Sequence, residues 1–228
     1  MLVAIHQLHY LPWLRYIDKI HRADVFIVLD DIQFNKNGWQ NRNKIKSNSG
    51  PLTLTVPVRA HAHQKLNEVR IHNEIDWQKK HWRSLEQNYK NAPYFSDYAP
   101  FFKETYATHW DGLNDLNRHM LSFYIDALGI KTSIVYASDL NVPGGATERL
   151  VNLIKAVHGT TYYSGAYALE TYLDETLLDE NHIQLELQQW HPSEYPQLHG
   201  PFTPDLSVLD LLFNCGAESL DALCAQAT

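Results

Sequence analysis

Hydrophobic and polar positions along the first thirty residues predict a strand, a helix and a second strand. Leu2 to Ile5 is a short apolar run, and Pro12 suits the first turn of a helix that we expect to continue to about Arg22. Val25 to Leu29 is a continuous β-branched and aromatic run, as expected of a strand covered on both faces. A right-handed crossover would make the two strands parallel, so the opening predicts a βαβ unit.

The rest of the chain is predicted to be helical in its middle and to return to alternating strands and helices. Apolar residues alternate with polar residues and proline from 52 to 58, and 68–72 is the expected partner strand. The predicted helices span 76–90, 97–108, 113–128, 147–158 and a final segment from 205, and the later strands span 132–137, 160–163 and 183–188. We therefore predict an α/β fold, Rossmann-like, with a mostly parallel sheet and flanking helices. It would form a single domain over 1–228, with a helical insertion at about 75–130.

Composition narrows the class of protein mainly by exclusion. The longest apolar runs fall far short of the ~20 residues that a membrane helix needs, so no membrane insertion is expected. The chain opens on Leu2 to Ile5 without a basic region or a small-residue cleavage site, which predicts a cytoplasmic protein. Cys215 and Cys224 lack the spacing of a zinc site, so we expect reduced packing cysteines. The net charge of -7 argues against a general nucleic-acid binder.

Candidate catalytic residues follow the first two predicted strands. His6 and His9 come after the first strand, and Asp30 and Asp31 come after the second. Neighbouring strands lie only ~5 Å apart, so parallel strands would bring these side chains to one edge of the sheet. Histidine can transfer protons there, and aspartate can orient it or hold Mg²⁺. The alternative is that His6 caps the strand while Asp31 is solvated.

A basic stretch lies between Asn35 and Gly50 in this otherwise acidic chain. It contains four cations, no carboxylate, several amide side chains and Trp39. Such a stretch can attract an anionic substrate, although most charge runs are simply solvated loops. Both interpretations stay open. The four cations are Lys36, Arg42, Lys44 and Lys46.

Three later stretches carry further candidates. Gly144 and Gly145 precede a predicted helix with Thr147 and Arg149 in its first turn, where a phosphate could bind; ordinary turn chemistry with Thr147 as N-cap is the alternative. Ser164 and Gly165 suit a tight loop near a ligand, without the pattern of a nucleophilic serine. A proline-rich loop around His199 is either functional or a structural wrap.

One further stretch is predicted to pack rather than to bind. Trp77, His81 and Leu85 recur at helical spacing and predict the buried face of a helix with a basic outer side.

The residues predicted to bind substrate come from several parts of the chain. They are Gln7, Tyr10, Gln33, Trp39, Arg42, Asn43, Lys44, Lys46, Thr147, Arg149, Ser164, Gly165 and His199.

Several segments, in this order along nearly the whole chain, resemble the WbqC-like family of bacterial proteins. They are "IHQLHYLPWLRYIDKIHRADVFIVLDDIQF", "WQNRNKIK", "LTVPV", "YYSG", "YPQLHGPF" and "LSVLDLLFNCG". The resemblance implies a link to gene clusters for surface polysaccharides such as O-antigen. It also implies a transferase, with aminoacyl or glycyl transfer suggested for a member.

The opening is also distantly similar to nucleotidyltransferases and pantothenate synthetases, whose H-x-G-H motif binds ATP phosphates at a helix N-terminus. In this chain the last two motif positions fall on Pro12 and Trp13, so the second histidine is missing. This similarity implies a nucleotide with Mg²⁺ as the cofactor and a nucleotide or nucleotide-sugar as the small-molecule substrate.

Three functions follow as hypotheses. The first is a transferase that works at the carboxyl edge of the sheet. The second is a metal-dependent hydrolase in which His6, His9 and an aspartate bind zinc. The third is a non-catalytic sugar-nucleotide binding protein, favoured if the histidines are buried and hydrogen-bonded.

Overall fold

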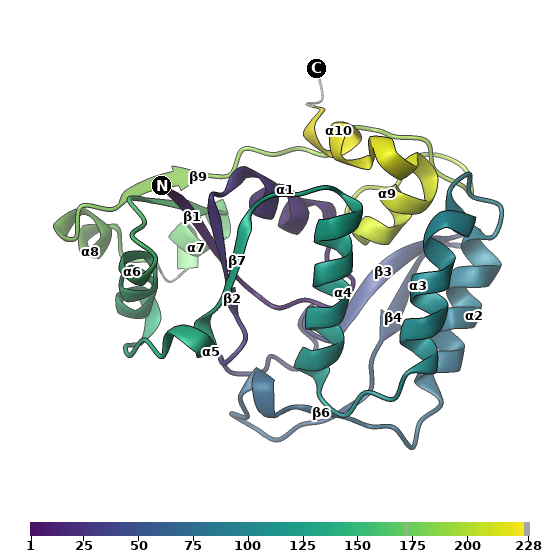
Figure 1. Ribbon diagram of the computed structural model, residues 1–228, viewed down its shortest axis with the longest axis horizontal. Helices are drawn as coiled ribbons and strands as arrows, with labels where there is room; N and C mark the ends of the chain where they lie inside the picture. The colour runs from purple at the N-terminus through teal and green to yellow at the C-terminus, as the bar shows by residue number, and fades with distance from the viewer. Residues whose placement is uncertain (172, 226–228) are drawn as a thin grey trace. The chain divides into compact units, whose positions relative to one another are not determined.

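The computed structural model describes residues 1–171 and 173–225, and its chain contacts divide into two compact units. The first unit comprises Met1–Leu8, Asp18–Ile32 and Ile130–Trp190. The second unit comprises His9–Ile17, Gln33–Gly129 and His191–Thr228. Figure 1 shows the elements of both. The expectation of a single domain with an insertion stays a prediction.

The first unit is built on a five-stranded sheet in which every pair of neighbours is parallel. The order across the sheet is β7-β2-β1-β8-β9. Along the chain, β2 and β7 are added on one side of β1, and β8 and β9 are then added on its other side. The direction of winding reverses between β1 and β8, where α/β proteins of this type bind ligands. The strands are β1 (Leu2–Gln7), β2 (Val25–Leu29), β7 (Ser133–Tyr136), β8 (Thr161–Ser164) and β9 (Gln184–Leu187).

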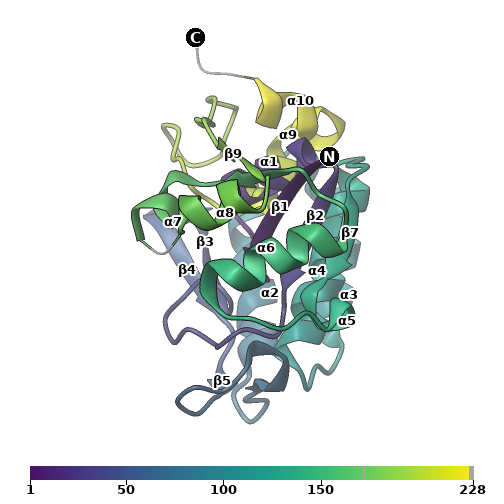
Figure 2. The same ribbon diagram turned by 90° about the vertical axis from the view of Figure 1, so that its left-hand side faces the viewer.

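Helices cover this sheet and bury its apolar strands. The longest, α6, lies across the strands in Figure 2 and buries Leu150, Leu153 and Ile154 in the core of the unit. The chain returns from α6 through Gly159, where a Cβ atom would lie 2.5 Å from the Val3 side chain, so only glycine allows this close approach. The helices are α1 (Leu14–Arg22, of which the residues from Asp18 onward belong to this unit), α5 (Ala137–Leu140), α6 (Ala146–Ala156), α7 (Ala166–Thr171) and α8 (Glu175–Glu180).

The second unit contains two short antiparallel pairs of strands. The hairpin of β3 (Arg42–Ser47) and β4 (Gly50–Thr55) turns at Gly50, whose φ of 102° suits glycine. The predicted pairing of 52–58 with 68–72 is right only at Val58, which pairs with Ile71 where β5 (Val58–Arg59) meets β6 (Arg70–Ile71); most of the predicted strand is β4, and β4 pairs with β3 instead. The solvated-loop interpretation of 35–50 is wrong over 42–47, because this segment is a strand that buries Ile45.

Helices form most of the second unit. In Figure 1, α2 and α3 run side by side next to the β3–β4 hairpin. The predicted face of Trp77, His81 and Leu85 is buried, as its helical spacing indicated, and every residue of α9 is buried. The helices are η1 (Leu66–Glu68), α2 (Trp77–Tyr89), α3 (Phe95–Ala107), α4 (Leu113–Ala127), α9 (Val208–Cys215), η2 (Gly216–Glu218) and α10 (Ser219–Cys224).

The predicted fold class is confirmed, since a parallel sheet with flanking helices is an α/β architecture of the Rossmann type. The predicted strand at 25–29 is β2 itself, and the three central helices begin and end within two residues of their predicted bounds. Across the described residues, no helix combines the length and the apolar character needed to cross a membrane.

Candidate functional site

The carboxyl ends of all five parallel strands meet at one edge of the sheet in the first unit. His6 is paired with Val28, and Gln7 with Leu29, so Asp30 and Asp31 follow β2 at the same edge at which β1 ends. The βαβ geometry thus places His6 and both aspartates as the sequence predicted. Their catalytic roles remain a prediction that rests on their chemistry.

The ring of His6 contacts the backbone at the end of β1. Its Nδ1 lies 3.3 Å from the backbone oxygen of Gln7, and its side chain is half-buried. In the tautomer in which Nδ1–H donates to this carbonyl oxygen, the basic nitrogen is Nε2. An imidazole in this state can accept a proton from a substrate.

Asp30 is bound to the protein rather than open to a substrate. Its carboxylate is 1% exposed and accepts hydrogen bonds from the backbone N–H of Ser138 at 3.0 Å and from the Ser138 hydroxyl at 2.7 Å. Ser138 lies at the start of α5, directly after β7. Asp30 therefore ties the end of β2 to the end of β7, which favours a structural role over the predicted catalytic one.

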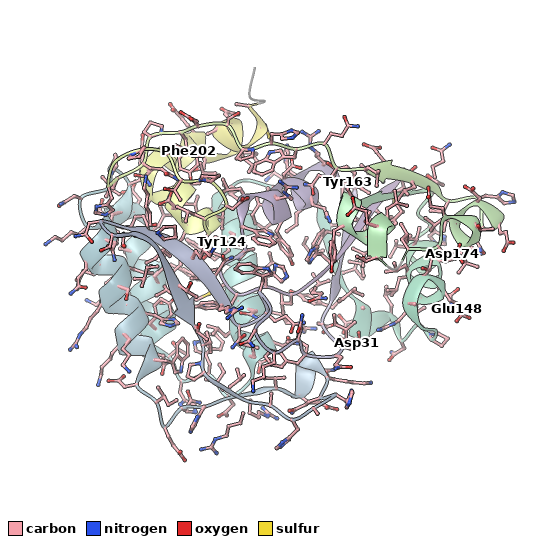
Figure 3. All side chains as sticks on the ribbon, turned by 180° about the vertical axis from the view of Figure 1, so that it is seen from behind. Asp31, Tyr124, Glu148, Tyr163, Asp174 and Phe202 are labelled. Atoms are coloured by element: carbon pink, nitrogen blue, oxygen red, sulfur yellow. The ribbon has the colours of Figure 1, made fainter. Side chains whose placement is uncertain are left out.

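Asp31 forms an ion pair with Arg149, which was expected to meet a phosphate. Nη2 of Arg149 lies 2.5 Å from Oδ2 of Asp31, and both side chains are 18% exposed. The other carboxylate oxygen, Oδ1, is buried and has no hydrogen-bond partner among the described residues. Figure 3 labels Asp31 and, on the neighbouring α6, Glu148. A buried acceptor of this kind favours a ligand that donates a hydrogen bond or carries a cation.

A buried cation lies where the winding of the sheet reverses. Gly165 follows β8, and a Cβ atom built on it would lie 3.8 Å from Nζ of Lys19. Lys19 is 7% exposed, and Ser164 next to the glycine is 2% exposed. An ammonium group beside a glycine at the carboxyl edge is suited to bind the phosphate of a ligand.

Asp18, the residue before Lys19 in α1, is the centre of a hydrogen-bond network. The fully buried Asp18 carboxylate accepts hydrogen bonds from Arg22 Nε and from Gln188 Nε2, each at 2.7 Å. Burial, with the Asp18 charge next in importance, raises the pKa of Tyr163 to about 12. Tyr163 is labelled in Figure 3. The network anchors α1 to the ends of β8 and β9 and so positions Lys19.

Sequence reasoning missed Asp18, Lys19 and Gln188. A signal was available for the first two, because they interrupt the buried face of a short amphipathic helix between Ile17 and Ile20. Charged residues at core positions are rare unless they are paired.

Thr147 does not cap α6, contrary to the alternative interpretation of this segment. The N-cap is Gly145, and the buried Thr147 hydroxyl oxygen accepts a hydrogen bond from the backbone N–H of Asp174 at 3.0 Å. Thr147 thus attaches the start of α8 to α6. This contact gives Thr147 a structural partner in place of the predicted substrate.

His9 belongs to the second unit, where its ring packs among aromatic side chains. It stacks on Tyr16 at a centroid distance of 5.0 Å, meets Trp13 edge-on at 6.0 Å and is 4% exposed. Tyr10 is fully buried, and its hydroxyl contacts His81 Nδ1 at 2.7 Å. These contacts favour packing for both residues instead of catalysis and substrate binding.

Two of the predicted anion-binding residues in the basic stretch are interior residues. Lys46 is 2% exposed, and its ammonium donates to Oε1 of Gln197 at 2.9 Å and to the Pro201 carbonyl at 2.5 Å. Asn43 is fully buried and donates to the Leu11 carbonyl at 2.5 Å. Both side chains stabilise the second unit, so the proposed patch is reduced to the remaining cations.

Other predicted residues of the basic stretch lie at the surface of the second unit. Lys44 is exposed, with Nζ 6.0 Å from the ring centroid of the half-buried Trp39. Arg42 donates to the Asn37 carbonyl, and Gln33 pairs with Lys65 in an isolated bridge. A substrate-binding role for these residues stays a prediction.

The proline-rich loop around His199 is a structural wrap in the second unit. The Tyr195 hydroxyl and the Gln197 amide donate to the buried Asp210 carboxylate at 2.7 and 2.8 Å. Nε2 of His199 lies 2.8 Å from the backbone oxygen of Asn88 and donates to it. These bonds fasten the loop to α9 and α2, and none of them requires a ligand.

The comparisons with known proteins agree with the resemblance seen in the sequence. No solved structure matches the chain. The chain is 41% identical over 225 residues to the protein named "Uncharacterized protein Rv1507c" of Mycobacterium tuberculosis (strain ATCC 25618 / H37Rv), and the match covers 97% of this chain and 96% of that relative. The model of the WbqC-like protein family matches residues 7–222. The chain therefore belongs to the WbqC-like protein family.

Proposed function

We propose that this protein is a transferase that binds a nucleotide or a nucleotide-sugar at the carboxyl edge of the five-stranded sheet. The observation that carries the proposal is the buried Lys19 ammonium beside Gly165, at the point where the strand order reverses between β1 and β8. Open α/β sheets bind phosphorylated ligands at this point. An ammonium group at this position can form charge-assisted hydrogen bonds to a nucleotide phosphate.

In this proposal each group has one task. Lys19 binds the phosphate, which becomes the leaving group and takes the electron pair of the bond that breaks. His6 Nε2 accepts the proton that the acceptor loses as it bonds to the transferred group. Oδ1 of Asp31, a buried acceptor without a described partner, receives a hydroxyl of the ligand or the Mg²⁺ that accompanies its phosphates.

The biological context is part of the same proposal. The transferred group is a sugar or an aminoacyl group such as glycyl, and the product belongs to bacterial surface polysaccharide metabolism, made in the cytoplasm. The metal-dependent hydrolase is less well supported, because no group of three histidine, cysteine, aspartate or glutamate side chains among the described residues could hold a metal ion. Mg²⁺ would instead arrive with the nucleotide.

The non-catalytic binding protein is the second candidate. The buried, aromatic-packed His9 and the hydrogen-bonded Asp30 favour it, since neither residue is placed to react. The two candidates share the ligand site and differ only in whether His6 transfers a proton.

Binding measurements on variants of Lys19 and His6 test the proposal. We expect calorimetry to show binding of ATP or UDP-glucose to the wild type. Replacing Lys19 with Met should weaken it at least about tenfold by removing a charge-assisted contact to phosphate. Lys155→Met is the matched control, because Lys155 is an exposed residue of α6 whose ammonium bonds to Asn181.

His6→Asn separates the two candidates. A transferase should keep nucleotide binding within about threefold in this variant and lose most of its turnover, since a general base contributes about 10²-fold or more. Equal nucleotide affinity in wild type and Lys19→Met would contradict the site. Binding that depends on Lys19 without any turnover of the bound nucleotide would support the non-catalytic candidate.

A further inference from the structure

A cavity of the second unit lies on the β5–β6 pair. Its volume is about 620 Å³, which is within the range of small-molecule sites. The cavity is open, and its lining is mainly polar and charged. The lining residues are Arg59, Arg70, Ile71, Asn73, Glu74, His109 and Asp111.

Two arginines lie directly opposite each other in this cavity. Arg59 on β5 and Arg70 on β6 are partners in the antiparallel register, so their side chains leave the same face of the pair. Like charges in directly opposed positions destabilise a sheet. A pair of two-residue strands has little other interaction to offset this repulsion. Carboxylates near the pair can offset this repulsion, so the partners of each arginine decide whether a further anion is favoured.

Among the described residues, a carboxylate pairs with Arg59 but none pairs with Arg70. Nη2 of Arg59 lies 2.7 Å from Oε1 of Glu74, and this hydrogen bond is the main reason why the pKa of Glu74 is lowered. Asp111 instead contacts Nε2 of His109, at 3.0 Å. Arg70 is exposed, and its guanidinium forms no hydrogen bond or ion pair with any residue in 1–171 or 173–225. The N–H groups of Arg70, which lines the cavity, thus have no carboxylate partner among the described residues.

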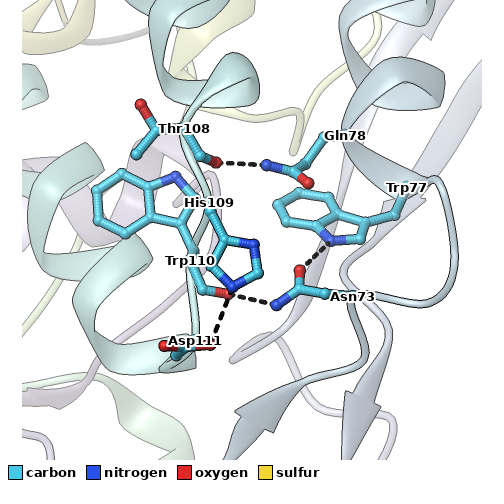
Figure 4. Close-up of polar contacts among 7 residues, drawn as sticks. All are labelled: Asn73, Trp77, Gln78, Thr108, His109, Trp110 and Asp111. Carbon is cyan, nitrogen blue, oxygen red and sulfur yellow. Dashed lines mark hydrogen bonds and ion pairs between the residues drawn. The ribbon is translucent and has the colours of Figure 1, made fainter.

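The segment of the cavity lining that contains His109 is held by hydrogen bonds on either side of it. Figure 4 shows that Asn73 donates to the Trp110 carbonyl at 2.8 Å and that Trp77 Nε1 donates to Asn73 Oδ1 at 3.4 Å. Gln78 donates to the Thr108 carbonyl in the same loop. These bonds hold His109 next to the cavity before a ligand arrives, which reduces the entropic cost of binding.

We propose that this cavity is a binding site for the carboxylate or phosphate group of a small molecule, with Arg70 as the primary contact. The planar guanidinium binds either oxyanion through two parallel hydrogen bonds. Arg59, paired with Glu74, lies on the opposite strand, and Asn73 and His109 line the same cavity. The proposal concerns the second unit alone and stands independently of the transferase site.

The test is a titration followed by NMR at constant ionic strength, on protein labelled with ¹⁵N. One arm uses inorganic phosphate and the other uses glucuronate, a sugar that carries a carboxylate. We expect saturable shifts of the Arg70 and Arg59 Nε–H signals in at least one arm. The arm that saturates at the lower concentration identifies the oxyanion.

Variants decide whether the arginine pair is the site. Arg70→Gln should weaken the binding of that anion at least about tenfold. Arg83→Gln is the matched control, because Arg83 is an exposed arginine of α2 that does not line the cavity, and it should change the affinity by less than about twofold. The proposal would be overturned if the shifts grew linearly with anion concentration and no faster than in a sodium chloride titration. Equal anion affinity in wild type and Arg70→Gln would also overturn it.

Discussion

Replacing Asp210 with Ala should lower the free energy of unfolding by about 3–5 kcal/mol. The fully buried carboxylate accepts hydrogen bonds from the Tyr89 and Tyr195 hydroxyls, each at 2.7 Å, and from the Gln197 amide at 2.8 Å. Burial raises the pKa of Asp210, whereas these donors and the Lys46 charge act in the opposite direction. Alanine would leave several buried donors without an acceptor.

Urea unfolding at neutral pH measures this loss. Asp126→Ala is the matched control, because Asp126 is an exposed carboxylate near the end of α4, and it should change the free energy by less than about 0.5 kcal/mol. Asp210→Asn should fall between alanine and wild type, since it keeps one oxygen acceptor. If Asp210→Ala were as stable as the Asp126→Ala control, the packing of the proline-rich loop against α9 would not depend on this carboxylate.

The second large effect is a loss of stability in acid caused by His81. Burial lowers its pKa from 6.5 to about 4, and a hydrogen bond to the Thr55 backbone opposes this only in part. Its Nδ1 accepts a hydrogen bond from the Tyr10 hydroxyl, which in turn contacts the Tyr106 hydroxyl at 2.6 Å. The folded protein therefore keeps His81 neutral in a pH range where the unfolded chain protonates it.

The direction of the effect follows from this difference in pKa. Between about pH 6.5 and pH 4 the unfolded chain binds one more proton at this residue, so the folded state loses about 3 kcal/mol as the pH falls. His81→Gln removes the titrating group, so its unfolding free energy should depend less on pH over this window. The exposed His61→Gln should leave the pH dependence unchanged. Parallel pH profiles for wild type and His81→Gln would contradict the assignment.

The parts of the fold that could be predicted are those in which local hydrophobic pattern and structure agree. Val25 to Leu29 and the helix face of Trp77, His81 and Leu85 are examples, since their burial follows from composition and spacing alone. The parallel βαβ opening then brings His6 and Asp31 to the same edge of the sheet through a general rule of handedness.

The parts that could not be predicted depend on partners that are distant in sequence. Lys46 and Asn43 look like surface residues of a basic stretch, yet contacts with the proline-rich loop and with Leu11 make them interior residues. Arg149 was expected to bind phosphate, but it pairs with Asp31, 118 positions earlier. Sequence pattern alone cannot identify such pairs, because burial of a polar residue depends on tertiary contacts.

The most direct test of the central claim is to map where a nucleotide binds. The protein is irradiated with an azido derivative of ATP or of UDP-glucose, digested, and analysed by mass spectrometry, with the unmodified nucleotide as competitor. The account predicts competable labelling within the segments that end β1 and β8, around His6 and Gly165, and loss of this labelling in Lys19→Met but not in Lys155→Met. Competable labelling confined to the second unit, or labelling of the sheet edge that persists in Lys19→Met, would contradict it.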